Sequence, residues 1–331
     1  MIAADSVDSL YAHVGPVVAA LVGGTSHVEA VKVAPPAEYY PNVRAWFSPR
    51  TRIATISPEI DRQLDAFYDT TLNRRRGLNA NEANEIWQLG LVKTAMVTLV
   101  ATVLRGVGPA DDRLMRAEWD AFWQRPHVHT VTAGVCELTA ALIVDQVTAE
   151  LGMVARDPRL TAARPLQAHY AAQSTLIDSL IGELSGTRHT APGAELAALA
   201  ASGSSELATW RLGGRFAGAP GVESADRPAA LSDYHATIAA GLAGFGADWA
   251  VVDSGEPEAD TALAERWTRV LSRDLNTSAL RARSGPGGMP DITRLAAEIS
   301  KAAQAAQEEV TQKMDHLQDV WTMMEEMGVE G

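Results

Sequence analysis

The sequence predicts an α+β protein that is predominantly α-helical, with a small N-terminal antiparallel sheet and a long C-terminal amphipathic helix. Three observations lead to this fold class. Residues 27–58 alternate between apolar and polar or are β-branched, and prolines punctuate them, as in short strands and turns. From Pro58 onward, apolar residues recur at the spacing of helices. Residues 291–327 contain neither glycine nor proline and keep that spacing throughout.

The strands are expected where HVEAVKVA, VRAWF and RIATIS occur, as one three-stranded antiparallel sheet. Ser57 followed by Pro58 predicts a helix start, with serine as N-cap and proline at the first helical position. Asn79 and Glu82 resemble a capping box, which opens a helix that should end at Leu104 or Arg105. Glycine and proline in residues 106–109 stop that helix.

Further helices are expected at 109–124, 131–151, 166–184 and 256–275. Residues 187–256 are rich in Ala, Gly and Ser, which predicts short helices packed through small side chains. The segment Trp249 to Asp253 could form one short strand. Residues 283–290, RSGPGGMP, form the clearest linker because glycine and proline there do not continue a helix.

The chain has 331 residues, 47% of them hydrophobic and 21% charged, and is therefore long enough to bury its own core. We expect four segments: 1–155 with the sheet and helices, 156–282 as a helical domain, the linker 283–290, and the helix 291–331. Cys136 is the single cysteine, so no intramolecular disulfide and no cysteine-based zinc cluster is possible. A lone cysteine fits a reducing compartment.

The net charge of −13 opposes binding to phosphate backbones, so no nucleic-acid partner is expected. The N-terminus is acidic where a signal peptide needs a basic start. Residues 89–104 are apolar but are interrupted by polar residues and fall short of a membrane span. We therefore expect no membrane partner, and a cytoplasmic location or one within a particle assembled inside the cell.

The C-terminal segment is expected to bind a partner protein or a second copy of the chain. A helix over 291–327 would reach about 55 Å at 1.5 Å per residue, more than a core of this size needs. The alternative is a helix that lies along its own domain. The expected contact residues are Ile292, Leu295, Ile299, Val310, Met314, Leu317, Val320, Trp321 and Met324.

The order of parts over residues 43–150 resembles a gluzincin-type zinc metallopeptidase domain. In that family an edge strand precedes a long helix with the His-Glu-x-x-His motif, and a second helix supplies a third ligand. Here RIATIS is followed by VKTAMVTLVATVLRGVGP and then by VTAGVCELTAALIVDQ. The resemblance implies that residues 91–108 correspond to the active-site helix and residues 133–137 to the third-ligand segment.

Carried over by position, the resemblance places Ala101 at the first histidine, Thr102 at the general base, Arg105 at the second histidine and Ala133 at the third ligand. Alanine offers zinc no ligand atom, and a permanently charged arginine opposes a divalent cation. The resemblance therefore implies a scaffold that has lost its zinc ligands, with no catalytic residue and no cofactor. The alternative is that these are ordinary core helices.

His127 and His129 offer a second candidate site. In an extended segment this spacing puts both rings on one side, where Glu137 or Asp145 could complete a metal site. The alternative is a histidine pair without a metal. Cys136 is expected to be a small buried hydrophobe, because nothing near it in sequence would lower its pKa.

The leading functional hypothesis is a non-catalytic structural or adaptor protein of a larger assembly, such as a phage particle, a secretion or injection machine, or a regulatory complex. The runner-up is a metal-dependent hydrolase that uses His127, His129 and Glu137. A third possibility is a small-molecule binding module in residues 187–256. No nucleotide-binding or serine-hydrolase motif occurs in the sequence.

Overall fold

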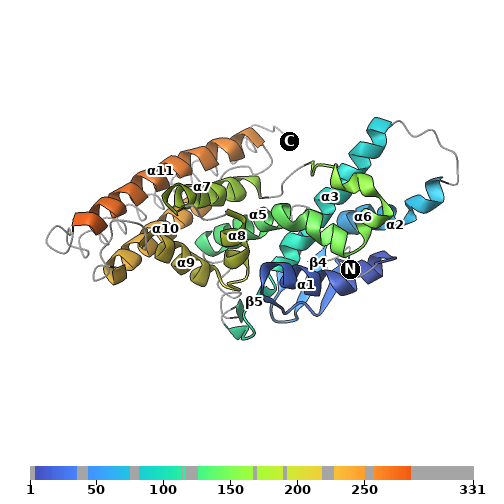
Figure 1. The fold of residues 1–331 in the computed structure, drawn as a ribbon, viewed down its shortest axis with the longest axis horizontal. Helices are drawn as coiled ribbons and strands as arrows, with labels where there is room; N and C mark the ends of the chain where they lie inside the picture. The colour runs from blue at the N-terminus through green and yellow to red at the C-terminus, as the bar shows by residue number, and fades with distance from the viewer. Residues whose placement is uncertain are drawn as a thin grey trace, which may run out of the picture.

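A computed structural model describes residues 4–35, 44–74, 82–113, 115–116, 126–166, 170–188, 192–217, 227–249 and 257–284. The described chain is mostly helical with small sheets near the N-terminus, which confirms the predicted fold class. The molecule is elongated, with α1, α2 and α3 toward one end, α7, α10 and α11 toward the other, and α5 between them (Figure 1).

The predicted strands form a three-stranded sheet in the order β2 (Ala30–Val33), β4 (Ile53–Ile56), β3 (Ala45–Ser48). Strands β3 and β4 pair antiparallel, with Phe47 opposite Ala54, whereas β2 runs parallel to β4. Phe47 and Ala54 are buried because strand side chains alternate between two faces. A second, two-stranded antiparallel sheet pairs β1 (Thr25–Ser26) with β5 (Val107–Gly108).

The N-terminal helices are α1 (Val7–Val22), α2 (Pro58–Arg74) and α3 (Glu82–Leu104). Helix α2 begins as predicted: the hydroxyl of Ser57 accepts a hydrogen bond from the Ile60 N–H at 3.3 Å. Helix α3 ends as predicted, and Gly106 follows it where a Cβ atom would lie 2.8 Å from the Phe47 ring. Glycine there lets the sheet approach the end of the helix closely.

Helix α5 (Pro126–Glu150) is the central helix of the molecule. It packs against α1 and α3 on the N-terminal side and against α7, α8, α9 and α10 on the other. The short helices α6 (Met153–Arg156) and η2 (Pro158–Thr161) follow it. One apolar core cluster extends from Ala4 to Leu275, and α5 contributes to its middle. The four predicted segments remain a prediction.

The C-terminal helices are α7 (Ala171–Arg188), α8 (Pro192–Ala200), α9 (Ser205–Ala217), α10 (Arg227–Trp249) and α11 (Pro257–Ser284). Small residues bring them together, as expected. Gly213 of α9 faces the His235 backbone of α10, and Gly241 and Gly244 of α10 face Leu271 and Trp267 of α11.

Several predicted boundaries differ from those of the structure. Helix α11 continues to Ser284, beyond the expected end at Leu275, and includes the first two residues of the predicted linker. Helix α7 begins at Ala171 rather than at 166. Most of the predicted helix 109–124, the predicted strand after Trp249, the rest of the linker and the whole C-terminal helix lie outside the described residues.

Buried Lys93 ties α3 to α5 and to the segment after η2. Its Nζ atom donates to the carbonyl of Ala163 at 2.6 Å and lies 2.7 Å from Oδ1 of Asp145 on α5. An ammonium group is buried at low cost only when it is paired in this way. Lys93, one of the polar residues in the apolar sequence of α3, therefore holds α3 to α5 and to the segment after η2.

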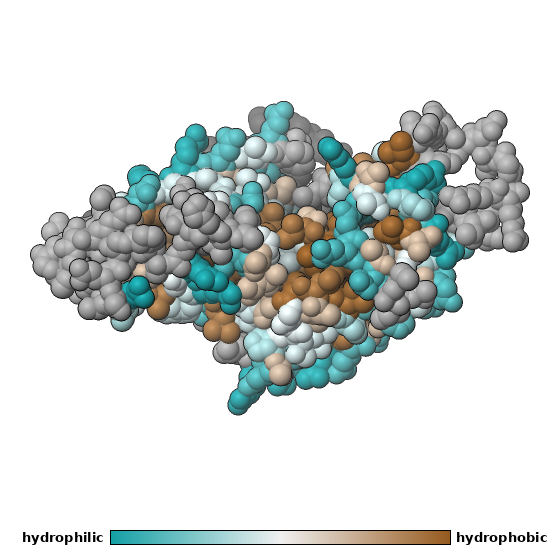
Figure 2. Space-filling view, in the orientation of Figure 1, coloured by the Kyte–Doolittle hydropathy of each residue, from teal (hydrophilic) through white to brown (hydrophobic). Residues whose placement is uncertain are grey.

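In the part of the chain that the structure describes, two helices are long and apolar enough, by length and composition, to cross a membrane. They are the parts of α3 and α5 at Ile86–Leu104 and Val128–Glu150, of which 72% and 67% are buried inside the protein. Core helices of folded proteins also meet this criterion, so length and composition alone do not assign a membrane. On the face drawn in Figure 2, hydrophobic residues gather near the middle of the molecule.

Candidate functional site at the junction of α3, α5 and α9

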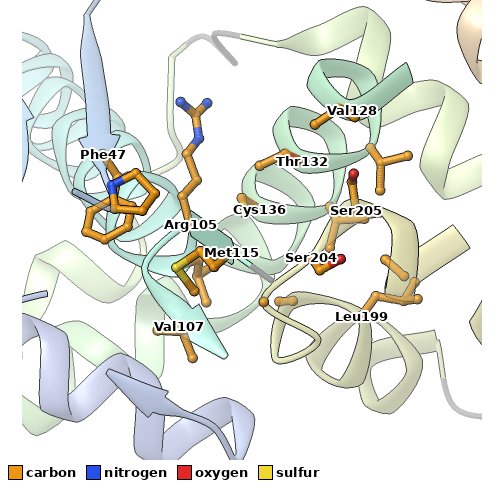
Figure 3. Close-up of a pocket in the computed structure, with 17 residues that line it drawn as sticks. Phe47, Arg105, Val107, Met115, Val128, Thr132, Cys136, Leu199, Ser204 and Ser205 are labelled. Carbon is orange, nitrogen blue, oxygen red and sulfur yellow. The ribbon is translucent and has the colours of Figure 1, made fainter. Parts of the chain in front are cut away.

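A cavity of about 70 Å³ lies where the end of α3, the first turns of α5 and the start of α9 meet (Figure 3). Strand β3 and the end of α8 complete its walls. Most of the lining side chains are apolar; the polar ones are Arg105, Thr132, Cys136, Ser204 and Ser205. Figure 3 shows Arg105 on one side of the site and Ser204 and Ser205 on the other.

Arg105 follows the last residue of α3, and its guanidinium lies 5.4 Å from the centre of the Tyr170 ring in a cation–π contact. Its Nε atom is enclosed and has no hydrogen-bond partner among the described residues. Burial opposes the charge, but Tyr170, Cys136 and Glu137 outweigh it and raise the pKa of Arg105 above its ordinary value. The site therefore contains a permanent positive charge.

Buried Glu137 and an aromatic group lie beside Arg105. The backbone N–H of Tyr170 donates to Oε2 of Glu137 at 2.7 Å. His129 stacks on Trp249 with ring centres 5.1 Å apart and meets the Tyr170 ring edge-on at 5.4 Å. The first turns of α5 are thus held to the start of α7 and the end of α10 by ring contacts.

Cys136 lines the same cavity from α5. Burial raises the pKa of its thiol to about 12, and Glu137 adds to that shift while Arg105 opposes it. The thiol is therefore protonated near neutral pH, and a protonated thiol is a poor nucleophile. Its surroundings match the expected small buried hydrophobe.

The four positions that the peptidase resemblance singled out lie on α3 and α5, and these two helices pack together. Ala101 and Ala133 are buried. The Thr102 hydroxyl donates to the Thr98 carbonyl of its own helix at 2.8 Å. Arg105 alone of the four lines the cavity.

The geometry expected for His127 and His129 is wrong. The segment is not extended but forms the first turn of α5, where Pro126 occupies the first position. Successive residues of a helix are turned by about 100°, so positions two apart do not lie on one side as they do in a strand. The His127 side chain lies outside the described residues. Within the described part of the chain, no group of three or more His, Cys, Asp or Glu side chains could hold a metal ion.

Sequence reasoning missed the roles of Tyr170, Trp249 and Ser204. Tyr170 and Trp249 join His129 from distant helices, and no local pattern indicates such a contact. Ser204 had a readable signal. Its hydroxyl accepts from the Leu207 N–H at 3.2 Å, so it caps α9, as a serine that follows glycine before a helical segment often does.

No protein-family model, curated protein or solved structure matches the chain. Its function is therefore inferred below from its own residues and their surroundings.

Proposed function

We propose that the chain is a non-catalytic structural or adaptor protein of a larger assembly. In this proposal a helical body with a metallopeptidase-like arrangement, but without zinc ligands, presents the C-terminal segment 291–331 to a protein partner or to a second copy. No cofactor is required for such a role.

The environment of Arg105 is the single observation that carries the non-catalytic part. Its guanidinium lies against Tyr170 at the end of α3, where a zinc peptidase would place a neutral ligand. A fixed positive charge beside a protonated thiol repels a divalent cation and offers it no ligand atom. The polar groups of this junction hold helices together instead of aligning a reaction.

The packing of α3 supports only part of the metallopeptidase-like arrangement. Helix α5, which bears Ala133, lies beside α3, as the resemblance requires of its second helix. Strand β4, which is formed by residues of RIATIS, lies in the middle of its sheet between β2 and β3 and not at the edge, where the resemblance requires it. The edge strand that packs against the end of α3 is β3, whose Phe47 contacts Gly106.

Exposed apolar side chains support a role in binding another protein. Ile86 and Trp87 are neighbours near the start of α3, and their exposed fractions are 57% and 53%. Large apolar groups left in water on a folded protein commonly mark contact surfaces. The expected contact residues of segment 291–331 add an apolar stripe to them.

Mass measurement in solution on the full chain tests the proposal. Replacing Leu295 and Leu317 by aspartate places two charges on the apolar stripe, which should reduce the assembly to a single folded chain. The matched control adds the same charges at polar positions, Gln304→Asp and Gln318→Asp. The control should keep the mass of the unmodified protein.

Light scattering coupled to gel filtration gives the mass, and circular dichroism confirms that each variant is folded. Equal masses for the stripe variant and the unmodified protein, when the latter is larger than one chain, would refute self-assembly through segment 291–331. A single-chain unmodified protein would leave a heterologous partner as the only form of the proposal, to be sought with the same pair of variants.

A further inference from the structure

The cavity at the junction of α3, α5 and α9 has the character of a small-molecule site. Val131 and Val135 of α5 and Ala208 of α9 are among its apolar walls. One water-sized group occupies roughly 10–15 Å³ of cavity volume. The cavity volume of about 70 Å³ therefore holds about five to seven such groups. That is the size of a short alkyl chain or a single ring.

The charge of the cavity is opposite to that of the protein. Among the described residues that line it, Arg105 is the only charged one, in a chain of net charge −13. The aliphatic part of Arg105 forms one side of the site, and its guanidinium extends to the edge, away from Ser204 and Ser205 (Figure 3). Guanidinium groups bind carboxylates through paired hydrogen bonds.

Ser204 and Cys136 bring no charge to the cavity. The Ser204 hydroxyl already accepts from the Leu207 N–H at 3.2 Å, so the start of α9 is capped by the chain itself. Cys136 brings a neutral thiol, because burial keeps it protonated. Among the described lining residues, an anionic group of a ligand would meet one charge, that of Arg105, which Glu137 outside the lining partly offsets.

We propose that this cavity binds a small monocarboxylate, with its alkyl chain or ring among Val131, Val135 and Ala208 and its carboxylate facing Arg105. The inference concerns the cavity alone and does not depend on the proposed assembly role. A monocarboxylate suits the site better than a phosphate, because a phosphate would need several charged donors and the lining offers one.

Three probes with the same body test the charge preference on the full chain: hexanoate, 1-hexanol and hexylammonium. Isothermal titration calorimetry should show hexanoate binding about tenfold or more tightly than 1-hexanol, because a hydrogen bond to a charged group outweighs one to a neutral group. Hexylammonium should bind most weakly. Absence of hexanoate binding, or equal affinity for hexanoate and 1-hexanol, would overturn the proposal.

Two arginine variants test whether hexanoate affinity depends on Arg105 in particular or falls when any arginine is lost. Arg105→Met keeps the aliphatic stem and should reduce hexanoate affinity to that of 1-hexanol. Arg156→Met is the matched control: Arg156 also lies over a tyrosine ring, 5.0 Å from the centre of Tyr68, and has an enclosed Nε without a partner, but does not line the cavity. The control should bind hexanoate like the unmodified protein.

A third variant fills the cavity from α9. Ala208→Leu adds volume where Ala208 lines the wall and should abolish hexanoate binding, whether or not Arg105→Met folds. Unchanged hexanoate affinity in a folded Ala208→Leu protein would place the binding elsewhere and overturn the proposal. So would unchanged affinity in a folded Arg105→Met protein.

Discussion

Arg105 and Cys136 line the same cavity, but their surroundings favour the charged form of Arg105 and the neutral form of Cys136. Arg105 keeps its charge in a partly buried place because a tyrosine ring and Glu137 lie near it. Cys136 loses the ability to ionise near neutral pH because water is excluded from it. The pair differs from a thiolate–cation pair of a cysteine enzyme, in which the thiol pKa falls well below its ordinary value.

The buried thiol makes the free energy of unfolding depend on pH in the alkaline range. Burial raises the pKa of Cys136 from 9.0 to about 12, so above about pH 9 the unfolded chain loses this proton while the folded chain keeps it. The unfolded state then binds fewer protons, and the free energy of unfolding falls as pH rises toward 12. The slope from this one group is at most about 1.4 kcal/mol per pH unit.

Urea unfolding at about pH 8 and about pH 10.5 checks this prediction in the unmodified protein and in Cys136→Ala. The loss of stability between the two pH values should be smaller in Cys136→Ala, since the titrating thiol is gone. Tyr68, whose pKa burial also raises to about 12, contributes to the loss in both proteins and so cancels in the comparison. An equal loss in the two proteins would contradict the buried, protonated thiol.

At the scale of the elements, glycines determine how closely helices approach. Gly134 of α5 lies where an added Cβ would be 2.6 Å from the backbone oxygen of Gln173 and 2.7 Å from Ile177, both on α7. Gly182 of α7 has no neighbour within 4 Å of the same position. The first glycine is required by packing, and the second is not.

Replacing each glycine by alanine should therefore change stability in opposite directions. Gly182→Ala should gain about 0.5–1 kcal/mol from better helix propensity. Gly134→Ala gains the same propensity but forces α5 away from a backbone atom, and should lose about 1–2 kcal/mol overall. Chemical denaturation of both variants measures this. A stabilised Gly134→Ala protein would show that α5 and α7 do not pack this closely.

The sequence was most informative about elements whose signals are local. Ser57 with Pro58 predicted the start of α2, and the glycines after Leu104 predicted the end of α3. Helix α1 was not predicted, although Ser6 as N-cap and Gly23 in the left-handed region at φ 73° are its readable signals. Pro126 at the first position of α5 was a similar signal, and missing it led to the wrong geometry for His129.

Contacts between distant segments could not be read from the sequence. The parallel pairing of β2 with β4 depends on how the chain returns across the sheet, which no local pattern sets. The cavity combines residues from β3 through α9, and only Arg105 and Cys136 among them were singled out beforehand. Apolar spacing identifies the buried face of a helix but not the partner that covers it.

At the scale of the whole molecule, α5 joins two groups of helices into one core. The apolar cluster passes from α1 and α3 through α5 to α10 and α11 without interruption. The proposed assembly role rests on the positive charge of Arg105 at a position where the resemblance requires a zinc ligand, together with segment 291–331, which lies outside the described residues.

The metal content of the purified full chain tests the non-catalytic assignment most directly. Elemental analysis after purification, and again after incubation with zinc and gel filtration, should find no stoichiometric zinc, because Arg105 opposes a cation and the described residues contain no group of three side chains that could hold a metal ion. Stoichiometric zinc that disappears on His129→Ala would contradict the account and make the junction a metal-dependent hydrolase site.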